Sequence, residues 1–227
     1  QLARRNLGVN DLRNKVVIFC GVNRDQCSAD FLDYNIRYLI DIAEKQPKCI
    51  IFMSTVDIGL AVPNSYVKSK IAGEKVLAAS GVPYLTFRLP MLLGPSARQN
   101  HLYKMFNDRT VNLSGDSDFC YLKMTTVNKI LAYCLKHSIY GEVDLYLPND
   151  SLRLSDVDAV YNLRCQFGSD KIRMPDRAPK TPDAIKKILK PSSWELFTYL
   201  KENNFNTLSF FDHAIFNDKP DRLKETP

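Results

Sequence analysis

Long apolar runs are missing from this sequence, and so is a segment that would direct the chain across a membrane. A helix that spans a bilayer needs about 20 consecutive apolar residues, and no stretch approaches that length. The first residues, Gln1 to Arg5, do not have the charged-then-apolar order of a signal peptide. We therefore expect a cytoplasmic protein.

Metal-binding patterns are also missing. The cysteines form no C-x-x-C pair and have no histidines near them at the spacing of metal ligands, which argues against structural zinc and predicts no metal site. Cys20 and Cys49 lie in or beside apolar runs, where a free thiol behaves as a small hydrophobic side chain. Free thiols favour a reducing compartment. The six cysteines are Cys20, Cys27, Cys49, Cys120, Cys134 and Cys165.

Neither disorder nor nucleic-acid binding is indicated by the charge pattern. Charged residues make up 25% and hydrophobic residues 45% of the 227 residues, a balance typical of one sizeable core with or without a smaller lobe. The net charge is +6, but the basic residues are spread along the chain without an aromatic-basic motif. A mild positive balance suits an anionic ligand such as a nucleotide diphosphate.

Strand and helix patterns alternate over the first part of the chain. Short β-branched or apolar runs predict strands, the first of them buried on both faces of a parallel sheet, and segments of helical period lie between them. This order predicts a doubly wound α/β fold, whose ligands bind beyond the carboxyl ends of the strands, after Phe19, Met53 and Leu89. The predicted elements are strands 15–20, 49–53 and 83–89 and helices 30–44 and 66–79, the second helix being stopped by Gly81.

The pattern changes after residue 95. A more polar segment, 96–118, predicts a lobe inserted over the site, with a short helix near 101–106. A helix at 125–137 and a strand at 142–147 are expected to return to the sheet, and helices near 155 and at 194–202 flank a proline- and lysine-rich stretch. The predicted division is a Rossmann-like domain of residues 1–95 and 119–150, a smaller substrate lobe of residues 96–118 and 151–217, and a flexible tail of residues 218–227.

The most informative segment joins a predicted strand to a predicted helix. Ser54 and Thr55 stand at the end of the strand, and a Y-x-x-x-K pattern, Tyr66 and Lys70, opens the helix. Residues four apart share a helix face, and a nearby ammonium favours the phenolate, so the tyrosine can act as an acid or base near neutral pH. A serine hydroxyl beside it can hold a reacting oxygen. The pattern by itself is common, and its alternative interpretation is a surface helix with an i,i+4 contact.

Several segments, in the right order from Val9 to Asp150, resemble the extended short-chain dehydrogenase/reductases, a family of nucleotide-sugar epimerases, dehydratases and reductases. Together they are more specific than any one motif. The segments that carry the resemblance are VVIFCGVNRD, DYNIRYLIDIAE, STVDIG, YVKSKIAGE, FRLPMLLGP and SDFCYLKMTTVNKI.

Carried over by position, the resemblance implies roles for individual residues. Tyr66 becomes the general acid/base, Lys70 its partner and a ligand of the nicotinamide ribose, and Ser54 the hydroxyl that holds the reacting oxygen, with Thr55 as a neighbouring candidate. The implied cofactor is NAD or NADP, and the residues that would border it are Phe19, Cys20, Gly21, Asn23, Asn35, Lys70, Leu89 and Pro90.

The sequence also departs from the family. It contains no G-x-x-G-x-x-G fingerprint for the pyrophosphate, although QLARR resembles the part of the first helix that follows those glycines. We expect an upstream strand and glycine loop to be missing from the sequence as printed. The interval from Ser54 to Tyr66 is about half the usual length, as in some members that act on capsule and O-antigen sugars. Met91 stands where the family commonly has an asparagine that contacts the nucleotide-sugar, and Thr125-Thr126 stand in place of the family's D-D pair, so the identity of the sugar stays open.

The leading hypothesis is an NAD(P)-dependent reductase or epimerase of a nucleotide-linked sugar in polysaccharide biosynthesis. A dehydratase is less favoured, because Asp57 is not followed by the usual glutamate. The alternative is a non-catalytic Rossmann-fold scaffold or subunit. The resemblance further suggests a homodimer packed through the helices that begin near Asp30 and Tyr66.

Overall fold

The computed structural model describes residues 11–20, 30–60, 63–94, 100–175 and 177–203, with the side chains of residues 30–35 outside that description. The chain divides into two compact units. Unit 1 consists of Gln1–Pro90, Lys129–Pro148 and Met174–Leu189, and unit 2 of Met91–Asn128, Asn149–Arg173 and Lys190–Pro227.

Unit 1 is built on a parallel sheet, as the alternation of strand and helix patterns predicts. Its strand order is β1-β2-β3-β8, and each neighbouring pair is parallel. The strands are β1 (Val16–Phe19), β2 (Cys49–Thr55), β3 (Tyr84–Leu89) and β8 (Gly141–Asp144). This is a Rossmann-type α/β arrangement, and the predicted fold class is confirmed.

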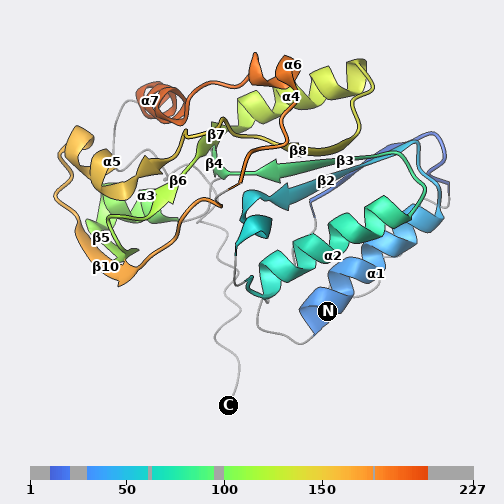
Figure 1. Cartoon of the computed structure of the whole chain (residues 1–227), viewed down its shortest axis with the longest axis horizontal. Coiled ribbons are helices and arrows are strands. Elements are labelled where there is room, and N and C mark those ends of the chain that lie inside the picture. The colour runs from blue at the N-terminus through green and yellow to red at the C-terminus, as the bar shows by residue number, and fades with distance from the viewer. Residues whose placement is uncertain (1–10, 21–29, 61–62, 95–99, 176, 204–227) are drawn as a thin grey trace. The chain divides into compact units, whose positions relative to one another are not determined.

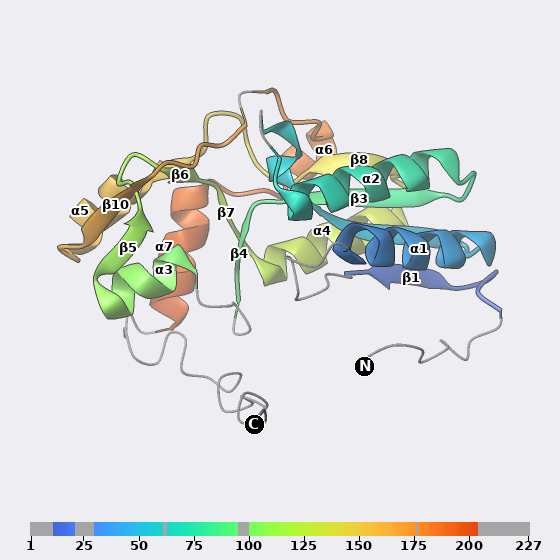
Figure 2. The ribbon, with the colours of Figure 1, turned by 90° about the horizontal axis from the view of Figure 1, so that it is seen from below.

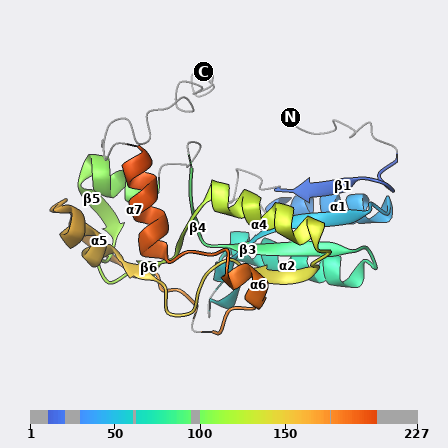
Figure 3. The ribbon, with the colours of Figure 1, turned by 90° about the horizontal axis from the view of Figure 1, so that it is seen from above.

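Helices cover both faces of this sheet. Figure 1 shows the strands nearly edge-on, with α1 (Asp30–Glu44) and α2 (Ser65–Ala79) on one side and α4 (Met124–Lys136) on the other. Figure 2 looks onto α1 and α2, and Figure 3 looks onto α4. A short 3-10 helix, η1 (Val56–Gly59), follows β2, and α6 (Asp183–Lys186) lies near the end of the unit. The sheet is therefore the middle of three layers.

The ends of α2 follow ordinary capping rules. Asn64 is the N-cap, and its side chain accepts a hydrogen bond from the backbone N–H of Val67. Gly81 stands just beyond the helix with a φ of +69°, the left-handed conformation that glycine adopts without a Cβ penalty. The predicted stop at this glycine is confirmed.

The first strand differs from its prediction. Val16 and Ile18 are 40% and 51% exposed, whereas Val17 and Phe19 pack against the cluster of Leu39, Phe52 and their neighbours. The expectation that this strand is buried on both faces is wrong for the described residues. Continuous apolar character suits a central parallel strand, but β1 is the edge strand of the described sheet and only one of its faces is covered.

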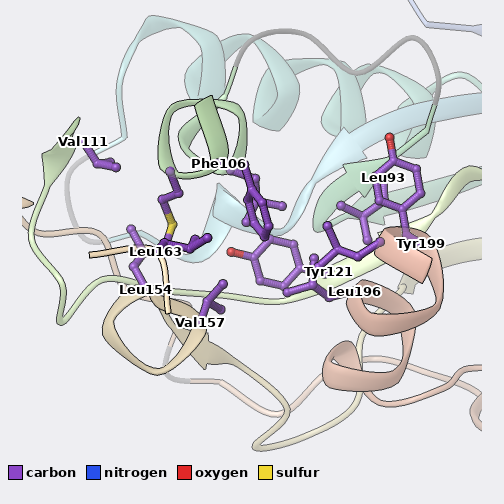
Figure 4. Packing of buried hydrophobic residues seen from close by; sticks show 12 residues of the cluster. Leu93, Phe106, Val111, Tyr121, Leu154, Val157, Leu163, Leu196 and Tyr199 are labelled. Carbon is purple, nitrogen blue, oxygen red and sulfur yellow. The ribbon is translucent and has the colours of Figure 1, made fainter. Parts of the chain in front are cut away.

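Unit 2 consists of short strands and helices around its own apolar core. Figure 4 shows this core, in which Tyr121 lies among leucine, valine and phenylalanine side chains. The strands are β4 (Met91–Leu93), β5 (Thr110–Leu113), β6 (Asp118–Phe119), β7 (Tyr121–Lys123), β9 (Leu152–Arg153) and β10 (Gln166–Asp170). The helices are α3 (His101–Tyr103), the π-helix η2 (Lys104–Asp108), α5 (Leu154–Tyr161) and α7 (Ser192–Glu202).

A buried polar pair lies within this core. The ring Nε2 of His101 is 2.9 Å from the Tyr121 hydroxyl, and the His101 ring stacks on Phe119. Burial lowers the pKa of His101 to about 3, so the imidazole is neutral across the physiological range. The pair is a core contact of unit 2.

The two units differ from the domains expected from the sequence at four segments. Residues 91–95, 119–128 and 149–150, which were expected to lie with the sheet, group with unit 2, and residues 174–189, which were expected in the substrate lobe, group with unit 1. Residues 174–189 belong to unit 1 because backbone and side chains of this segment bond to Asp144 at the end of β8.

Candidate functional site

The candidate site lies at the carboxyl end of β2, where parallel sheets bind their ligands. Thr55 is the last residue of this strand, η1 follows it directly, and α2 begins at Ser65. All of these elements belong to unit 1.

Lys70 is held at the end of β2 by burial and by a hydrogen bond. Its side chain projects from α2, is only 3% exposed, and donates a hydrogen bond from Nζ to the carbonyl oxygen of Met53 at 2.7 Å. Nζ also lies 5.0 Å from the centre of the Phe52 ring and 5.6 Å from that of the Tyr66 ring. Burial lowers the pKa of Lys70 to about 8, partly offset by Cys20.

The predicted Tyr66–Lys70 pair is therefore brought together. The ammonium stands over the face of the tyrosine ring at a distance where a cation and an aromatic ring attract each other. A positive charge at this place also favours the phenolate over the phenol. Chemically, the pair can accept and return a proton beside the end of β2.

Ser54 and Thr55 make different contacts. The Ser54 hydroxyl is buried and donates to Oε1 of Glu74 at 2.6 Å. The Thr55 hydroxyl donates to Oδ2 of Asp57 at 2.9 Å and accepts a hydrogen bond from the Asp57 backbone N–H at 3.3 Å. Burial raises the pKa of Asp57, and the bond from Thr55 opposes this rise.

Glu74 belongs to a chain of buried charges behind the site. Arg88 of β3 donates to both carboxylate oxygens of Glu74, and its Nη1 lies 3.9 Å from Oδ1 of Asp144. Asp144 is held in turn by two hydrogen bonds from Arg177, at 2.5 and 2.8 Å, and by the backbone N–H of Lys180. The network links β2, α2, β3 and β8 with the segment that follows residue 173.

The predicted cofactor-bordering residues are only partly described. Phe19 is half-buried and stacks on Phe52, with 5.9 Å between the ring centres. Cys20 is exposed, and the pKa of its thiol is raised by desolvation and lowered to a smaller extent by the charge of Lys70. Leu89 is half-buried and Pro90 buried. Gly21, Asn23 and the side chain of Asn35 lie outside the described residues.

Sequence reasoning missed the roles of Glu74, Arg88, Asp144 and Arg177. Glu74 and Arg88 stand inside the quoted segments YVKSKIAGE and FRLPMLLGP, so their positions carried a signal. Which residues they pair with could not be predicted, because the contacts form only where α2 packs against the neighbouring strands β2 and β3. Asp144 and Arg177, 33 residues apart, have no sequence pattern that joins them.

Comparison with known proteins gives a match by structure alone. No family model and no curated protein matches the sequence. The enzyme WbmG of Bordetella bronchiseptica, solved with NAD and UDP, has a TM-score of 0.62 at 18% identity, over 88% of this chain and 76% of that one. This is the fold of the extended short-chain dehydrogenase/reductases.

Two further proteins of this fold are named for different reactions. A mutant of the UDP-glucuronic acid 4-epimerase of Bacillus cereus, solved with a fluorinated UDP-sugar and NAD, has a TM-score of 0.60 at 16% identity, over 87% of this chain and 79% of that one. A dTDP-4-dehydrorhamnose reductase of Clostridium acetobutylicum has a TM-score of 0.61 at 15% identity, over 82% of this chain and 80% of that one. The short-chain dehydrogenase/reductase fold thus leaves the reaction open.

Two negative findings hold for the described part of the chain. None of its helices is long and apolar enough to span a membrane. No group of three or more histidine, cysteine, aspartate or glutamate side chains in it has the arrangement of a metal site.

Proposed function

We propose that this protein is an NAD(P)-dependent reductase or epimerase acting on a nucleotide-linked sugar. The observation that carries the proposal is the placement of Lys70: a buried ammonium at the carboxyl end of a parallel strand, over the ring of Tyr66. Ionisable side chains whose pKa is strongly shifted, such as a buried lysine with a lowered pKa, are concentrated at functional sites. The short-chain dehydrogenase/reductase fold supports the same interpretation.

In this proposal Tyr66 is the general acid/base. It takes the proton from a sugar hydroxyl when that carbon is oxidised and returns a proton when the carbonyl is reduced. Lys70 favours the phenolate by its charge and is held in place by the carbonyl of Met53. A hydroxyl of the Ser54-Thr55 pair holds the reacting oxygen at the end of β2.

The residues of unit 1 fit the nicotinamide end of a dinucleotide. Lys70 keeps two of its three ammonium protons for acceptors such as ribose hydroxyls after bonding Met53, and Phe19, Cys20 and Pro90 stand near the same strand ends. NAD or NADP would supply hydride transfer when bound. For the pyrophosphate, the printed sequence offers no glycine-rich loop.

A second copy of the chain is the proposed partner. The ends of α1 and α2 form an open groove of about 340 Å³, lined mainly by Ile40, Ala43, Val76 and Ala79. Ile40 is 38% exposed there. Burial of this apolar groove against the same helices of another copy would form a homodimer.

A non-catalytic scaffold is the competing function. It is favoured by the engagement of Ser54 with Glu74, which takes one candidate hydroxyl out of the reaction. A scaffold, however, gains nothing from a buried lysine charge, whose desolvation costs stability.

The test combines binding with turnover. The purified protein is titrated calorimetrically with NAD+, NADH and NADPH and assayed with UDP-glucose, UDP-glucuronic acid and dTDP-glucose. We expect binding of a cofactor and turnover of one sugar, with Tyr66→Phe lowering turnover by about 100-fold or more while binding persists. Tyr140→Phe, at a tyrosine that is 51% exposed, is the matched control and should change neither. Failure of all three cofactors to bind would favour the scaffold.

A further inference from the structure

Segment 174–181 lies at the carboxyl ends of strands of unit 1. It is part of Met174–Leu189, which groups with unit 1, whereas the chain before it, Asn149–Arg173, and the chain after it, Lys190–Pro227, group with unit 2. The segment, described except for residue 176, is therefore kept in unit 1 by its own contacts. These contacts lie at the end of β8 and at η1.

The contacts at β8 converge on Asp144, the last residue of that strand. Its side chain is fully buried and accepts hydrogen bonds from Nη1 of Arg177 at 2.8 Å, from Nη2 at 2.5 Å and from the backbone N–H of Lys180 at 2.6 Å. The backbone N–H of Asp144 donates to the carbonyl oxygen of Lys180 at 3.1 Å, and the Thr181 hydroxyl donates to the carbonyl oxygen of Asp144 at 2.7 Å. Main-chain and side-chain bonds thus fix the same short stretch, which holds Arg177 in a defined position.

The contacts at η1 are made by Pro175 and Arg177 against Gly59. A Cβ at Gly59, the last residue of η1, would lie 2.7 Å from Cβ of Pro175 and 3.1 Å from Nε of Arg177, so no side chain fits there without displacing the segment or η1. Glycine allows this close approach because it has no Cβ. Since η1 directly follows Thr55, the last residue of β2, the segment touches an element that borders the candidate site.

Arg177 therefore connects the ends of two strands. β2 and β8 stand on either side of β3, about 10 Å apart at the usual spacing of strands. The arginine bonds Asp144 through its Nη atoms and lies beside Gly59 with Nε. Within the described residues, this Nε is buried and has no hydrogen-bond partner. A buried donor without a partner costs stability, so the place of the side chain is set by packing against Gly59 as well as by its bonds to Asp144.

Asp144 also links the segment with α2. Nη1 of Arg88 lies 3.9 Å from Oδ1 of Asp144, and the same guanidinium donates to both carboxylate oxygens of Glu74. Glu74 stands on α2 one turn after Lys70. Without Arg177, the buried Asp144 carboxylate would attract Arg88 more strongly and weaken its hold on Glu74, because a buried charge that loses its partner is costly. Release of the segment would thus act on α2 as well as on η1.

We infer that Arg177 is a positioning residue of the candidate site: it docks segment 174–181 between Asp144 and Gly59, and the docked segment fixes η1 and the first turns of α2 at the strand ends. Both elements border the site, so the site is complete only while the segment is docked. The inference rests on the proposed function and deepens it. Arg177 acts through the elements that it holds, without a contact to the reacting atoms.

Hydrogen exchange tests the docking independently of any activity. Backbone amide exchange, followed by mass spectrometry, is compared between the wild-type protein and Arg177→Met, which removes the charge and keeps an unbranched side chain. We expect exchange to become about tenfold faster or more in η1 and in residues 65–72 of α2, while α7 of unit 2 keeps its wild-type rates. Arg13→Met, at an exposed arginine of unit 1, is the matched control and should change none of these rates.

Turnover tests the effect on the site. With the nucleotide sugar of the panel above that gives the highest wild-type rate, Arg177→Met should lower kcat by about tenfold or more, because a small misplacement of catalytic groups is costly. The rate is measured well below the melting temperature of the variant. A contact that served stability alone would lower the melting temperature and leave kcat unchanged. Arg177→Lys, which keeps the charge but bonds Asp144 through a single nitrogen, should lie between the wild type and Arg177→Met.

Gly59→Ala tests the same contact from the side of η1. The added Cβ displaces the segment or η1, so we expect the exchange pattern and the loss of kcat seen with Arg177→Met. The double variant should be no worse than the more damaging single variant, because both changes break one shared contact. Gly115→Ala, where a Cβ would meet contacts of 3.4 Å or more, is the control. Gly59→Ala also keeps the test open if Arg177→Met does not fold.

The inference is wrong if faster exchange in Arg177→Met is confined to segment 174–181, because the docked segment then fixes neither η1 nor α2. It is also wrong if exchange rises in both elements while kcat is unchanged, or if the effects of the Gly59 and Arg177 changes add. If the wild-type protein neither binds a cofactor nor turns over a sugar, the proposed function fails. The exchange experiment then still decides whether Arg177 positions the two elements.

Discussion

Arg88 and Glu74 form a buried fork between β3 and α2. Nη2 of Arg88 donates to Oε2 of Glu74 at 2.6 Å, and Nε lies 3.1 and 3.2 Å from the two carboxylate oxygens. The pair connects the hydroxyl of Ser54 on one side with Asp144 on the other. A charge pair this deep stabilises the fold only while both partners are present, because either one alone would be a desolvated charge.

Removal of one partner should therefore be costly. We expect Glu74→Ala to lower the free energy of unfolding by about 3–5 kcal/mol, measured by urea denaturation followed by circular dichroism. The double variant Glu74→Leu, Arg88→Met should be less destabilised than the sum of its single changes, because it buries no unpaired charge. Lys68→Ala, at an exposed position of α2, is the control and should cost less than about 0.5 kcal/mol. If Glu74→Ala lowers the free energy of unfolding as little as the control does, the Arg88–Glu74 pair does not stabilise the fold.

Lys70 should make stability depend on pH. Its pKa in the folded protein is about 8, below the usual 10.5, so the unfolded chain binds more protons between these two values. Stability from this group therefore rises as pH increases from about 8 to 10.5 and is lowest at neutral pH, the full difference being about 3 kcal/mol.

Lys70→Met should remove this dependence. We expect the variant to be more stable than wild type at pH 7 by about 1–2 kcal/mol, since it loses the desolvation cost but also the hydrogen bond to Met53. Its unfolding free energy should vary less between pH 8 and 10.5. Lys75→Met, at an exposed lysine of the same helix, should leave the wild-type pH profile in place. Identical profiles for wild type and Lys70→Met would contradict the burial of the charge.

Gly168 should tolerate no side chain. A Cβ at this position of β10 would overlap the carbonyl oxygen of Asn112 and lie 2.7 Å from its carbonyl carbon, both of which are backbone atoms that cannot rotate away. We expect Gly168→Ala to destabilise the protein by about 3 kcal/mol through overpacking, seen as a lower urea midpoint. At Gly115 a Cβ would meet only ordinary contacts of 3.4 Å or more, so Gly115→Ala should behave much like wild type.

The groove between α1 and α2 should act in dimer formation. Light scattering of the wild-type protein is expected to give twice the 25.9 kDa chain mass. Ile40→Glu, which places a charge in the groove, should shift the mass to that of a monomer, since an unpaired charge is costly in a buried interface. Val160→Glu, at a residue of α5 that is 75% exposed, should remain dimeric. A wild-type protein that is monomeric at micromolar concentration would refute the proposed homodimer.

Periodicity predicted α1, α2, β2 and β3 of unit 1 well because these elements are long and regular. The helix at 30–44 and the helix opening at Tyr66 were predicted within one residue of the observed α1 and α2. The strands of two to five residues in unit 2 went unpredicted, since so few residues carry no measurable period. The burial of β1 was predicted wrongly because apolar character alone does not show which strand lies at a sheet edge.

By itself, the sequence determined the alternation of strands and helices, the parallel sheet and the i,i+4 placement of Tyr66 and Lys70, because these depend on local periods of the backbone. Only the tertiary structure decided that Ser54 bonds Glu74, 20 residues away, while Thr55 bonds its near neighbour Asp57. Two adjacent hydroxyls look equivalent in a sequence. They differ in the fold because successive side chains of a strand point to opposite faces, and only one of these faces holds a buried carboxylate.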